Sequence, residues 1–369
     1  MKIAVTGGHL SPALAVSEEL KAKAEIVFIG RKYDFDKSNA FSLEYREITK
    51  LGVLFYHLNT GRFTRIFNLA FLINLIKVPI GFFQALSILL TEKPDLILSF
   101  GGYISFPVCS VGYLLGIPVF IHEQTVKPGL ANRLLAGPAK KIFLAFPQTK
   151  QYFPVNKVVV SGNPVRRQLL RVVRKPFEIN KTQPVIYITG GSLGSHSINQ
   201  IIEKIITKLL SEYILIHQTG QSAKYRDWQK LLRIKAKLPS RLKKNYFLKR
   251  HFYSEELGYI YSISDLVVGR SGANTFFELI AWKKPAVLIP LPWSANQEQL
   301  KHAELLAGAG VAEIFPQNNP ADELFSLIGK VQANLKDYKK NYKKVELLYE
   351  DNAARIIVKT ILAQITAKV

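Results

Sequence analysis

Short apolar runs alternate with turns of small and polar residues along the chain, and one stretch shows the pattern most completely. Between Ser264 and Pro292, an apolar run at 266–268 precedes a turn at 270–275, helical spacing at 276–282 and a second apolar run at 286–289. A short apolar run bounded by turn residues is typical of a buried strand. The stretch therefore predicts strand, turn, helix and strand, and doubly wound sheets bind ligands at such turns.

This turn has two features that favour a ligand. The first turn of the following helix offers unpaired N–H groups and a positive dipole end to an anion. Glu278 lies one to two turns into that helix, where its carboxylate can accept hydrogen bonds from two vicinal hydroxyls such as those of a ribose. A simple helix cap with a solvated Glu278 is the alternative that the stretch alone leaves open.

The same pattern occurs in two halves of the chain. A strand at 2–5, the turn 6–9 and a helix from Pro12 open the first half, and strands follow at 26–29, 96–99, 117–121, 142–145 and 158–160. A strand at 184–189 and the turn 190–195 restart the pattern, and strands follow at 213–218 and 246–252. We therefore predict an α/β protein with two Rossmann-like domains, whose parallel sheets face each other across a cleft. The predicted boundaries are 1–162 and 163–345, with a C-terminal helix at 346–369 that packs back toward the first domain.

The first glycine turn does not fit a nicotinamide cofactor. Its sequence is Thr6-Gly7-Gly8-His9 rather than a full GxGxxG, and Arg31 and Lys32 follow the second strand where an acidic residue is expected. His9 titrates near working pH, so it is a candidate general base. A histidine that only hydrogen-bonds within the loop is equally compatible with the local sequence.

The most apolar stretch, 66–90, is long enough to suggest a transmembrane helix. Lys77 lies near its middle, which costs about 2.5–3.5 kcal/mol on insertion scales, and Pro79 and Gly81 interrupt it. We therefore predict two helical pieces with a partly exposed apolar patch, flanked by Arg62, Arg65 and Lys77, that lies on an anionic membrane surface. The alternative is that these residues all belong to the core.

Composition narrows the choice of partners. The 369 residues contain 50 Lys and Arg against 27 Asp and Glu, a formal charge of +23 that favours an anionic partner. No nucleic-acid-binding motif accompanies the charge, so nucleic acid is not expected. Cys109 is the only cysteine, which excludes an internal disulfide, and the N-terminal residues do not have the pattern of a signal peptide.

Seven motifs in order give the chain a family resemblance: TGGH at 6–9, GGY at 101–103, HEQ at 122–124, GNPVR at 162–166, GGSLGS at 190–195, HQTG at 217–220 and RSGANTFFEL at 270–279. Together they closely resemble the MurG family of bacterial peripheral-membrane glycosyltransferases. The resemblance implies a GT-B fold, with an acceptor domain at 1–162 and a donor domain at 163–345. It also implies inverting transfer of N-acetylglucosamine from UDP-GlcNAc to the muramoyl 4-hydroxyl of lipid I, which yields lipid II and UDP in peptidoglycan synthesis.

The resemblance also implies roles for individual residues. His9 is the candidate base and Glu123 its rival, with no metal and no cofactor. The implied substrate-binding residues are Thr6, Gly7, Gly8, Thr125, Asn132, Arg166, Ser192, Asn199, Arg270, Ala273, Asn274, Thr275, Glu278 and Gln299. Within this set, Arg166 and Ser192 lie near the pyrophosphate with Asn199 as support, Glu278 is on the ribose, and Gln299 is near the sugar hydroxyls.

The sequence departs from the family pattern at three places. Thr125 stands where Asn usually follows HEQ, the glutamine pair is Glu298-Gln299, and an Ile near the uracil is replaced around Ser254. The implied partners are UDP-GlcNAc, lipid I, the cytoplasmic face of the bacterial membrane and other cell-wall synthesis proteins. Alternative functions are a related transferase acting on another lipid such as diacylglycerol, and an inactive sugar-nucleotide-binding scaffold.

Overall fold

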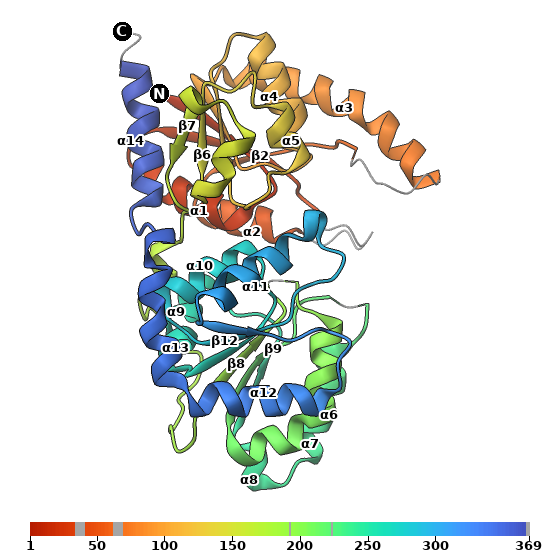
Figure 1. Ribbon diagram of the computed structural model, residues 1–369. Helices are drawn as coiled ribbons and strands as arrows, with labels where there is room; N and C mark the ends of the chain where they lie inside the picture. Colours follow the sequence, from red (N-terminus) through yellow and green to blue (C-terminus); the bar gives the residue numbers. More distant parts are fainter. Residues whose placement is uncertain (34–40, 62–68, 192, 223, 367–369) are drawn as a thin grey trace. The chain divides into compact units, whose positions relative to one another are not determined.

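The structure is a computed structural model that describes residues 1–33, 41–61, 69–191, 193–222 and 224–366. The chain divides into two compact units (Figure 1). Unit 1 comprises residues 1–166 and 350–369, and unit 2 comprises residues 167–349. Each unit is described by itself below.

Unit 1 contains a parallel sheet with the strand order β3-β2-β1-β4-β5-β6-β7. Its strands are β1 (Lys2–Thr6), β2 (Glu25–Gly30), β3 (Leu54–His57), β4 (Leu96–Ser99), β5 (Val119–Glu123), β6 (Lys141–Leu144) and β7 (Val158–Val160). Its helices are α1 (Leu10–Leu20), α2 (Leu43–Lys50), α3 (Leu69–Glu92), α4 (Ser105–Leu114), α5 (Leu130–Leu134) and α14 (Ala353–Thr366). The order reverses between β1 and β4, which places a topological switch point there.

The strands of unit 1 are buried on both faces, which explains their continuous apolar runs. In β1, Ala4 points into a core beneath α3 and α4, whereas Ile3 and Val5 point into a core beneath α1 and α14. α14 lies beside unit 1 in Figure 1 and packs against α1. Its residues Ile357, Val358 and Ile361 complete this second core.

Unit 2 repeats the architecture with the strand order β10-β9-β8-β11-β12-β13, again all parallel. Its strands are β8 (Val185–Thr189), β9 (Ile214–Gln218), β10 (Tyr246–Lys249), β11 (Leu266–Gly269), β12 (Ala286–Leu288) and β13 (Ala312–Ile314). Its helices are α6 (His196–Glu212), α7 (Asp227–Lys237), α8 (Ser240–Lys243), α9 (Ser254–Ile263), α10 (Ala273–Trp282), α11 (Glu298–Gly308), α12 (Ala321–Ala333) and α13 (Leu335–Asn341). The corresponding switch point lies between β8 and β11.

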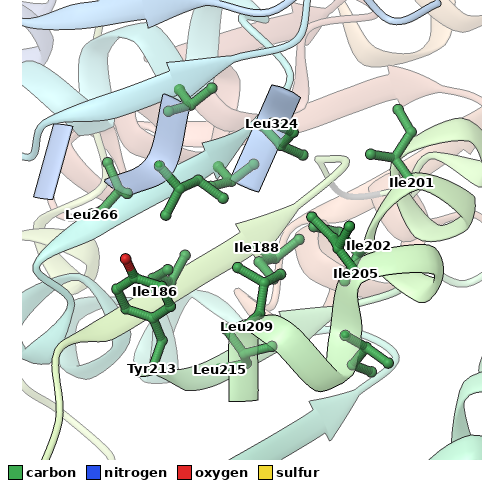
Figure 2. Close-up of a cluster of buried hydrophobic side chains, with 14 of the residues drawn as sticks. Ile186, Ile188, Ile201, Ile202, Ile205, Leu209, Tyr213, Leu215, Leu266 and Leu324 are labelled. Carbon is green, nitrogen blue, oxygen red and sulfur yellow. The ribbon is translucent and has the colours of Figure 1, made fainter. Parts of the chain in front are cut away.

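The core of unit 2 follows from helical spacing on α6. Ile198, Ile202, Ile205 and Leu209 recur at intervals of three and four, so they form one apolar stripe. The stripe packs on β8 and β9, and α12 adds Leu324 to the same cluster (Figure 2). Burying an isoleucine contributes about 1.5–3 kcal/mol, so this stripe fixes the orientation of α6 and of the loop before it.

The predicted fold class, two α/β domains with parallel sheets, is confirmed, and three details differ from prediction. The edge strands β3 and β13 were not predicted, because both are short and only partly buried. The prediction of two helical pieces at 66–90 was wrong, because in the described residues α3 is one helix that contains Pro79. Its buried residues, which include Ala85 and Leu89, pack with α4 and offset the hydrogen bond that Pro79 removes.

The C-terminal helix predicted at 346–369 begins only at Ala353. α13 and α14 are separated by short 3-10 turns at 342–344 and 346–348 and by Tyr349, which is extended.

Within the residues described, no helix combines the length and the apolar character that crossing a bilayer requires.

Candidate functional site

The turns that follow β1 and β4 meet at the switch point of unit 1. Gly8 N donates to Gly101 O at 2.8 Å, and Gly7 has a φ of +139°. A β-carbon on Gly7 would lie 2.7 Å from Phe100 N, so only glycine allows this approach. The two loops therefore form one rigid backbone surface at the carboxyl edge of the sheet.

His9 stands on this surface at the N-cap of α1. Its Nδ1 lies 2.6 Å from Nε2 of Gln124, the residue that follows β5. Burial lowers the pKa of His9, and the negative charge of Glu123 acts in the opposite direction. A neutral imidazole near the ligand end of the sheet is the form that can accept a proton.

Glu123 has both carboxylate oxygens occupied. Oε1 accepts from Thr125 N at 3.0 Å and Thr125 Oγ1 at 2.7 Å, while Oε2 accepts from Gly129 N and Asn132 Nδ2, both at 3.0 Å. A buried carboxylate that is held by four donors organises the loop before α5. This arrangement favours His9 over Glu123 as the base.

The remaining predicted residues near these two turns differ in the polar groups that they leave without a partner. Thr6 is buried and donates to Ile29 O at 2.9 Å, so its hydroxyl is used within the sheet. Thr125 is committed to Glu123. Asn132 Nδ2 donates to His122 O as well as to Glu123, but its buried Oδ1 has no hydrogen-bond partner among the described residues. An acceptor in this condition suits a ligand hydroxyl.

Arg166 also belongs to unit 1, but it lies in a different cluster. Its guanidinium contacts Glu18 of α1 at 2.8 Å and Glu47 of α2 at 3.0 Å. Glu18 is nine residues beyond His9, which is roughly 14 Å along the helix. Two carboxylates therefore already neutralise the buried cation that the resemblance places near the pyrophosphate.

In unit 2 the loops that follow the neighbouring strands β8 and β9 also approach each other closely. Gly194 has a φ of +82°, and a β-carbon on it would lie 2.2 Å from Thr219 O. This loop ends at Ser195, the N-cap of α6, whose Oγ accepts from Ile198 N. The predicted phosphate ligand Ser192 lies in the same loop but outside the described residues.

Arg270 reaches the start of α6 from the end of β11. Its Nη2 donates to Ser195 Oγ, Ser197 Oγ and Gln317 Oε1 at 2.8, 2.7 and 2.6 Å, and its Nη1 donates to Ile289 O. In the described part of the chain its partners are neutral oxygens rather than carboxylates. Burial lowers the pKa of Arg270 to about 10, so it remains a cation at neutral pH.

This buried charge and the N-terminus of α6 make one electropositive corner, which suits an anion such as a diphosphate. Sequence reasoning named Arg270 but missed Ser195, Ser197 and Gln317. Ser195 could have been found from the sequence, because serine is a preferred residue at a helix N-cap. Gln317 lies in a loop that is distant in sequence, so no local pattern indicates its contact.

Asn199 supports this corner from beneath. Its Nδ2 donates to Thr219 O at 3.0 Å and to Asp227 Oδ2 at 2.9 Å. Burial lowers the pKa of His217 to about 3, so that ring is neutral, and its Nε2 donates to Asn199 Oδ1 at 3.0 Å. All of these polar groups are used within the protein, so Asn199 positions the loop after β9.

The segment that follows β11 forms the first turns of α10. Ala273 and Thr275 are buried, Asn274 is exposed, and Glu278 is half-buried. Tyr261 donates its hydroxyl to Glu278 Oε2 at 2.7 Å, and burial raises the pKa of Glu278 to about 7. The Glu278 carboxyl therefore changes charge near neutral pH.

Gln299 lies at the start of α11. Its Oε1 accepts from Leu291 N at 3.0 Å, and its carbonyl accepts from Ser271 Oγ at 2.6 Å. These bonds connect Gln299 to the turn before α10 and to the loop after β12.

Among the described residues, no three His, Cys, Asp or Glu side chains are gathered as a metal site would need. A reaction without metal stays a prediction.

The chain contains two doubly wound units, one with an electropositive corner and the other with a buried histidine contact, and family models assign it to the glycosyltransferase class. Residues 5–144 match the glycosyltransferase family 28 N-terminal domain, and residues 185–360 match its C-terminal domain. The chain therefore belongs to glycosyltransferase family 28, and the resemblance to its MurG members is confirmed by the following comparisons.

Two similar relatives carry the same descriptive name, UDP-N-acetylglucosamine–N-acetylmuramyl-(pentapeptide) pyrophosphoryl-undecaprenol N-acetylglucosamine transferase. The one from Clostridium kluyveri is 33% identical over 334 residues, which is 88% of each chain. The one from Treponema denticola is 33% identical over 330 residues, which is 87% of this chain and 84% of the relative. The crystal structure of MurG from Acinetobacter baumannii is similar with a TM-score of 0.70 and 25% identity, covering 98% of this chain and 99% of that one.

We expect Glu123→Gln to destabilise unit 1. The glutamine amide directs an N–H₂ group at two of the four donors that the carboxylate now satisfies, which costs about 1–3 kcal/mol for each unsatisfied buried group. Thermal or urea unfolding measures the loss. Glu25→Gln, which changes the exposed Glu25 beside Lys2, is the matched control and should have little effect. A Glu123→Gln protein that is fully stable yet inactive would instead favour Glu123 as the base.

Proposed function

We propose that the chain transfers N-acetylglucosamine from UDP-GlcNAc to the 4-hydroxyl of the muramoyl sugar in lipid I, with lipid II and UDP as products. The observation that carries the proposal is the relationship at 32–33% identity, over most of the chain, with transferases of this name. The two sites described above supply the chemistry that such a transfer needs.

The donor fits unit 2. The diphosphate of UDP-GlcNAc carries negative charge, and the corner made by Arg270 and the N-terminus of α6 is positive, with no carboxylate paired to Arg270 among the described residues. As the sugar departs, charge grows on the leaving phosphate, so donors fixed in advance stabilise the transition state. Glu278 would accept hydrogen bonds from the ribose hydroxyls, and Gln299 would face the sugar hydroxyls.

The acceptor fits unit 1. His9 would take the proton of the attacking hydroxyl while that oxygen forms the new bond at the anomeric carbon. The bond from this carbon to the phosphate oxygen breaks on the opposite side, so the anomeric configuration inverts. Arg166 would contribute to the pyrophosphate only after leaving Glu18 and Glu47, so we assign it first to holding α1 and α2 together.

Purified protein should convert UDP-GlcNAc and a lipid I analogue to UDP and a lipid II analogue. Arg270→Lys should keep the charge but lose the forked geometry, and should therefore weaken donor binding about tenfold or more. Product analysis by mass spectrometry, with diacylglycerol as a competing acceptor, checks the reaction. Transfer to diacylglycerol alone would indicate the related lipid transferase, and donor binding without turnover would indicate a scaffold.

Donor affinity should depend on pH through Glu278. The free carboxyl has a raised pKa of about 7, and ribose hydroxyls that donate to the ionised form lower it in the complex. Binding therefore releases a proton, and Kd should fall as the pH rises from 6 to 8, by about tenfold if the pKa in the complex lies below 6. Calorimetric titration with UDP-GlcNAc, whose phosphates do not titrate in this range, measures the change.

Glu278→Gln is the control for this dependence. The amide keeps the shape but cannot ionise, so its Kd should be weaker than that of the parent protein at pH 8 and nearly independent of pH. The same pH dependence in both proteins would assign the effect to another group and remove Glu278 from the ribose.

Unit 1 also carries an apolar surface that suits the membrane-bound acceptor. Ile76, Ile80 and Phe83 are exposed on α3 at helical spacing, and the neighbouring α4 and α5 expose Leu114 and Leu130. Lys77 lies within this surface; the predicted flanking residues Arg62 and Arg65 lie outside the described residues. We propose that this surface rests on the anionic cytoplasmic face of the membrane, where the charge of +23 assists it.

Phe83→Ser combined with Leu114→Ser should weaken binding to vesicles of phosphatidylglycerol about tenfold or more, because both side chains are largely exposed and apolar. Co-sedimentation measures the binding. Leu347→Ser changes an equally exposed leucine in unit 2 and should leave binding unchanged. Equal binding by all three proteins would show that the surface is not used.

A further inference from the structure

We propose that Gln124 is the positioning residue of His9, because its side-chain amide holds Nδ1 of the ring and so determines which ring nitrogen takes the proton. The contact is short, 2.6 Å, and Gln124 is 6% exposed, so water does not compete for it. The inference rests on the base role of His9 proposed above. It adds a residue that makes no contact with the reacting atoms itself.

The amide matters because a neutral imidazole has one donor and one acceptor nitrogen. In the structure Gln124 directs its N–H₂ group at Nδ1, which leaves the ring proton on Nε2 of His9. A half-turn of the amide places Oε1 there instead, so that Nδ1 donates and the lone pair moves to the ring Nε2. This second arrangement is the one in which Nε2 acts as a base.

One observation and one chemical requirement favour the half-turn during the reaction. Oε1 of Gln124 is buried and has no hydrogen-bond partner in the described part of the chain, so turning the amide breaks no known bond at that oxygen. Once His9 has taken the proton it donates from both nitrogens, and only an acceptor at Nδ1 is then compatible. The amide therefore donates its N–H₂ group to Nδ1 of the neutral ring, and after the half-turn its Oε1 accepts from Nδ1 of the protonated ring.

The position of the ring indicates which edge faces the substrate. His9 Cδ2, which is bonded to Nε2, lies 3.4 Å from the point that a β-carbon on Gly101 would occupy, and Asn132 Oδ1 lies at the same distance from that point. Nε2 makes no hydrogen bond with the residues that the structure describes. The Nε2 edge therefore lies beside the Gly101 turn and Asn132, whose Oδ1 also lacks a partner.

The lack of charge on Gln124 also affects the pKa of His9. The ionisable groups that act on or beside the ring are Glu123, whose carboxylate is held by four donors, and His122, which burial keeps neutral with a pKa of about 3. A carboxylate at position 124 would add a second negative charge and favour the imidazolium. Glutamine orients the ring without that charge, so the base stays unprotonated at neutral pH.

The test compares Gln124→Glu, Gln124→Met and the control Gln151→Glu, which adds the same charge at an exposed position of unit 1. Histidine labelled with ¹⁵N reports the pKa and tautomer of each ring by NMR, and a His9→Gln protein identifies the His9 signals. The pH profile of kcat/KM is measured in parallel with UDP-GlcNAc and a lipid I analogue.

We expect Gln124→Glu to raise the pKa of His9 by about one unit or more and to move the acidic limb of kcat/KM by the same amount. Gln124→Met should lower kcat about 10–100-fold, within the range of general-base catalysis, with little change in KM. Gln151→Glu should match the parent protein in both measurements.

Two results would overturn the inference, and they are distinguishable. A His9 pKa that does not change in Gln124→Glu would refute the contact, whatever His9 does in the reaction. A His9 pKa that rises while the acidic limb stays in place would refute His9 as the base, and the positioning role of Gln124 would fail with it.

Discussion

The structure depends on the close approach of backbones at the carboxyl ends of neighbouring strands in each sheet. In unit 1 the turn after β1 lies against the turn after β4, and in unit 2 the loop after β8 lies against the turn after β9. No β-carbon fits at Gly7 or Gly194, so glycine is required by space as well as by φ. Because these turns are rigid, the side chains beside them keep fixed positions, and His9 and Arg270 are held without a large loop to order.

Each candidate site combines an inner group that we propose to face the ligand with a supporting group whose hydrogen bonds are fully used. Glu123 supports unit 1 with four accepted hydrogen bonds, and Asn199 supports unit 2 with three bonds to its neighbours. The inner groups are Asn132 in unit 1 and Arg270 in unit 2. Among the described residues, Asn132 Oδ1 has no hydrogen-bond partner and Arg270 has no counter-ion. Polar groups that have no partner inside the protein are the ones available to substrates.

The apolar runs predicted the central strands correctly, because parallel strands that are covered on both faces are continuously apolar. They did not predict β3 and β13, whose edge positions leave them partly exposed. The motifs identified the candidate site residues but not their contacts. Arg166 and Arg270 both lie in glycine-containing segments at strand ends, yet only Arg166 is paired with carboxylates, which lie 148 and 119 residues away in sequence. Long-range pairing of this kind is a property of the packed chain, and local sequence does not contain it.

The return of the chain to unit 1 affects the order in which the protein is completed during synthesis. Residues 167–349 are inserted into a unit whose core also needs Ile357, Val358 and Ile361, which are synthesised after them. The side chains of β1 that point toward α14 are therefore not covered by that helix until unit 2 has been synthesised. Unit 2 is continuous in the sequence, so it is able to fold before unit 1 is complete.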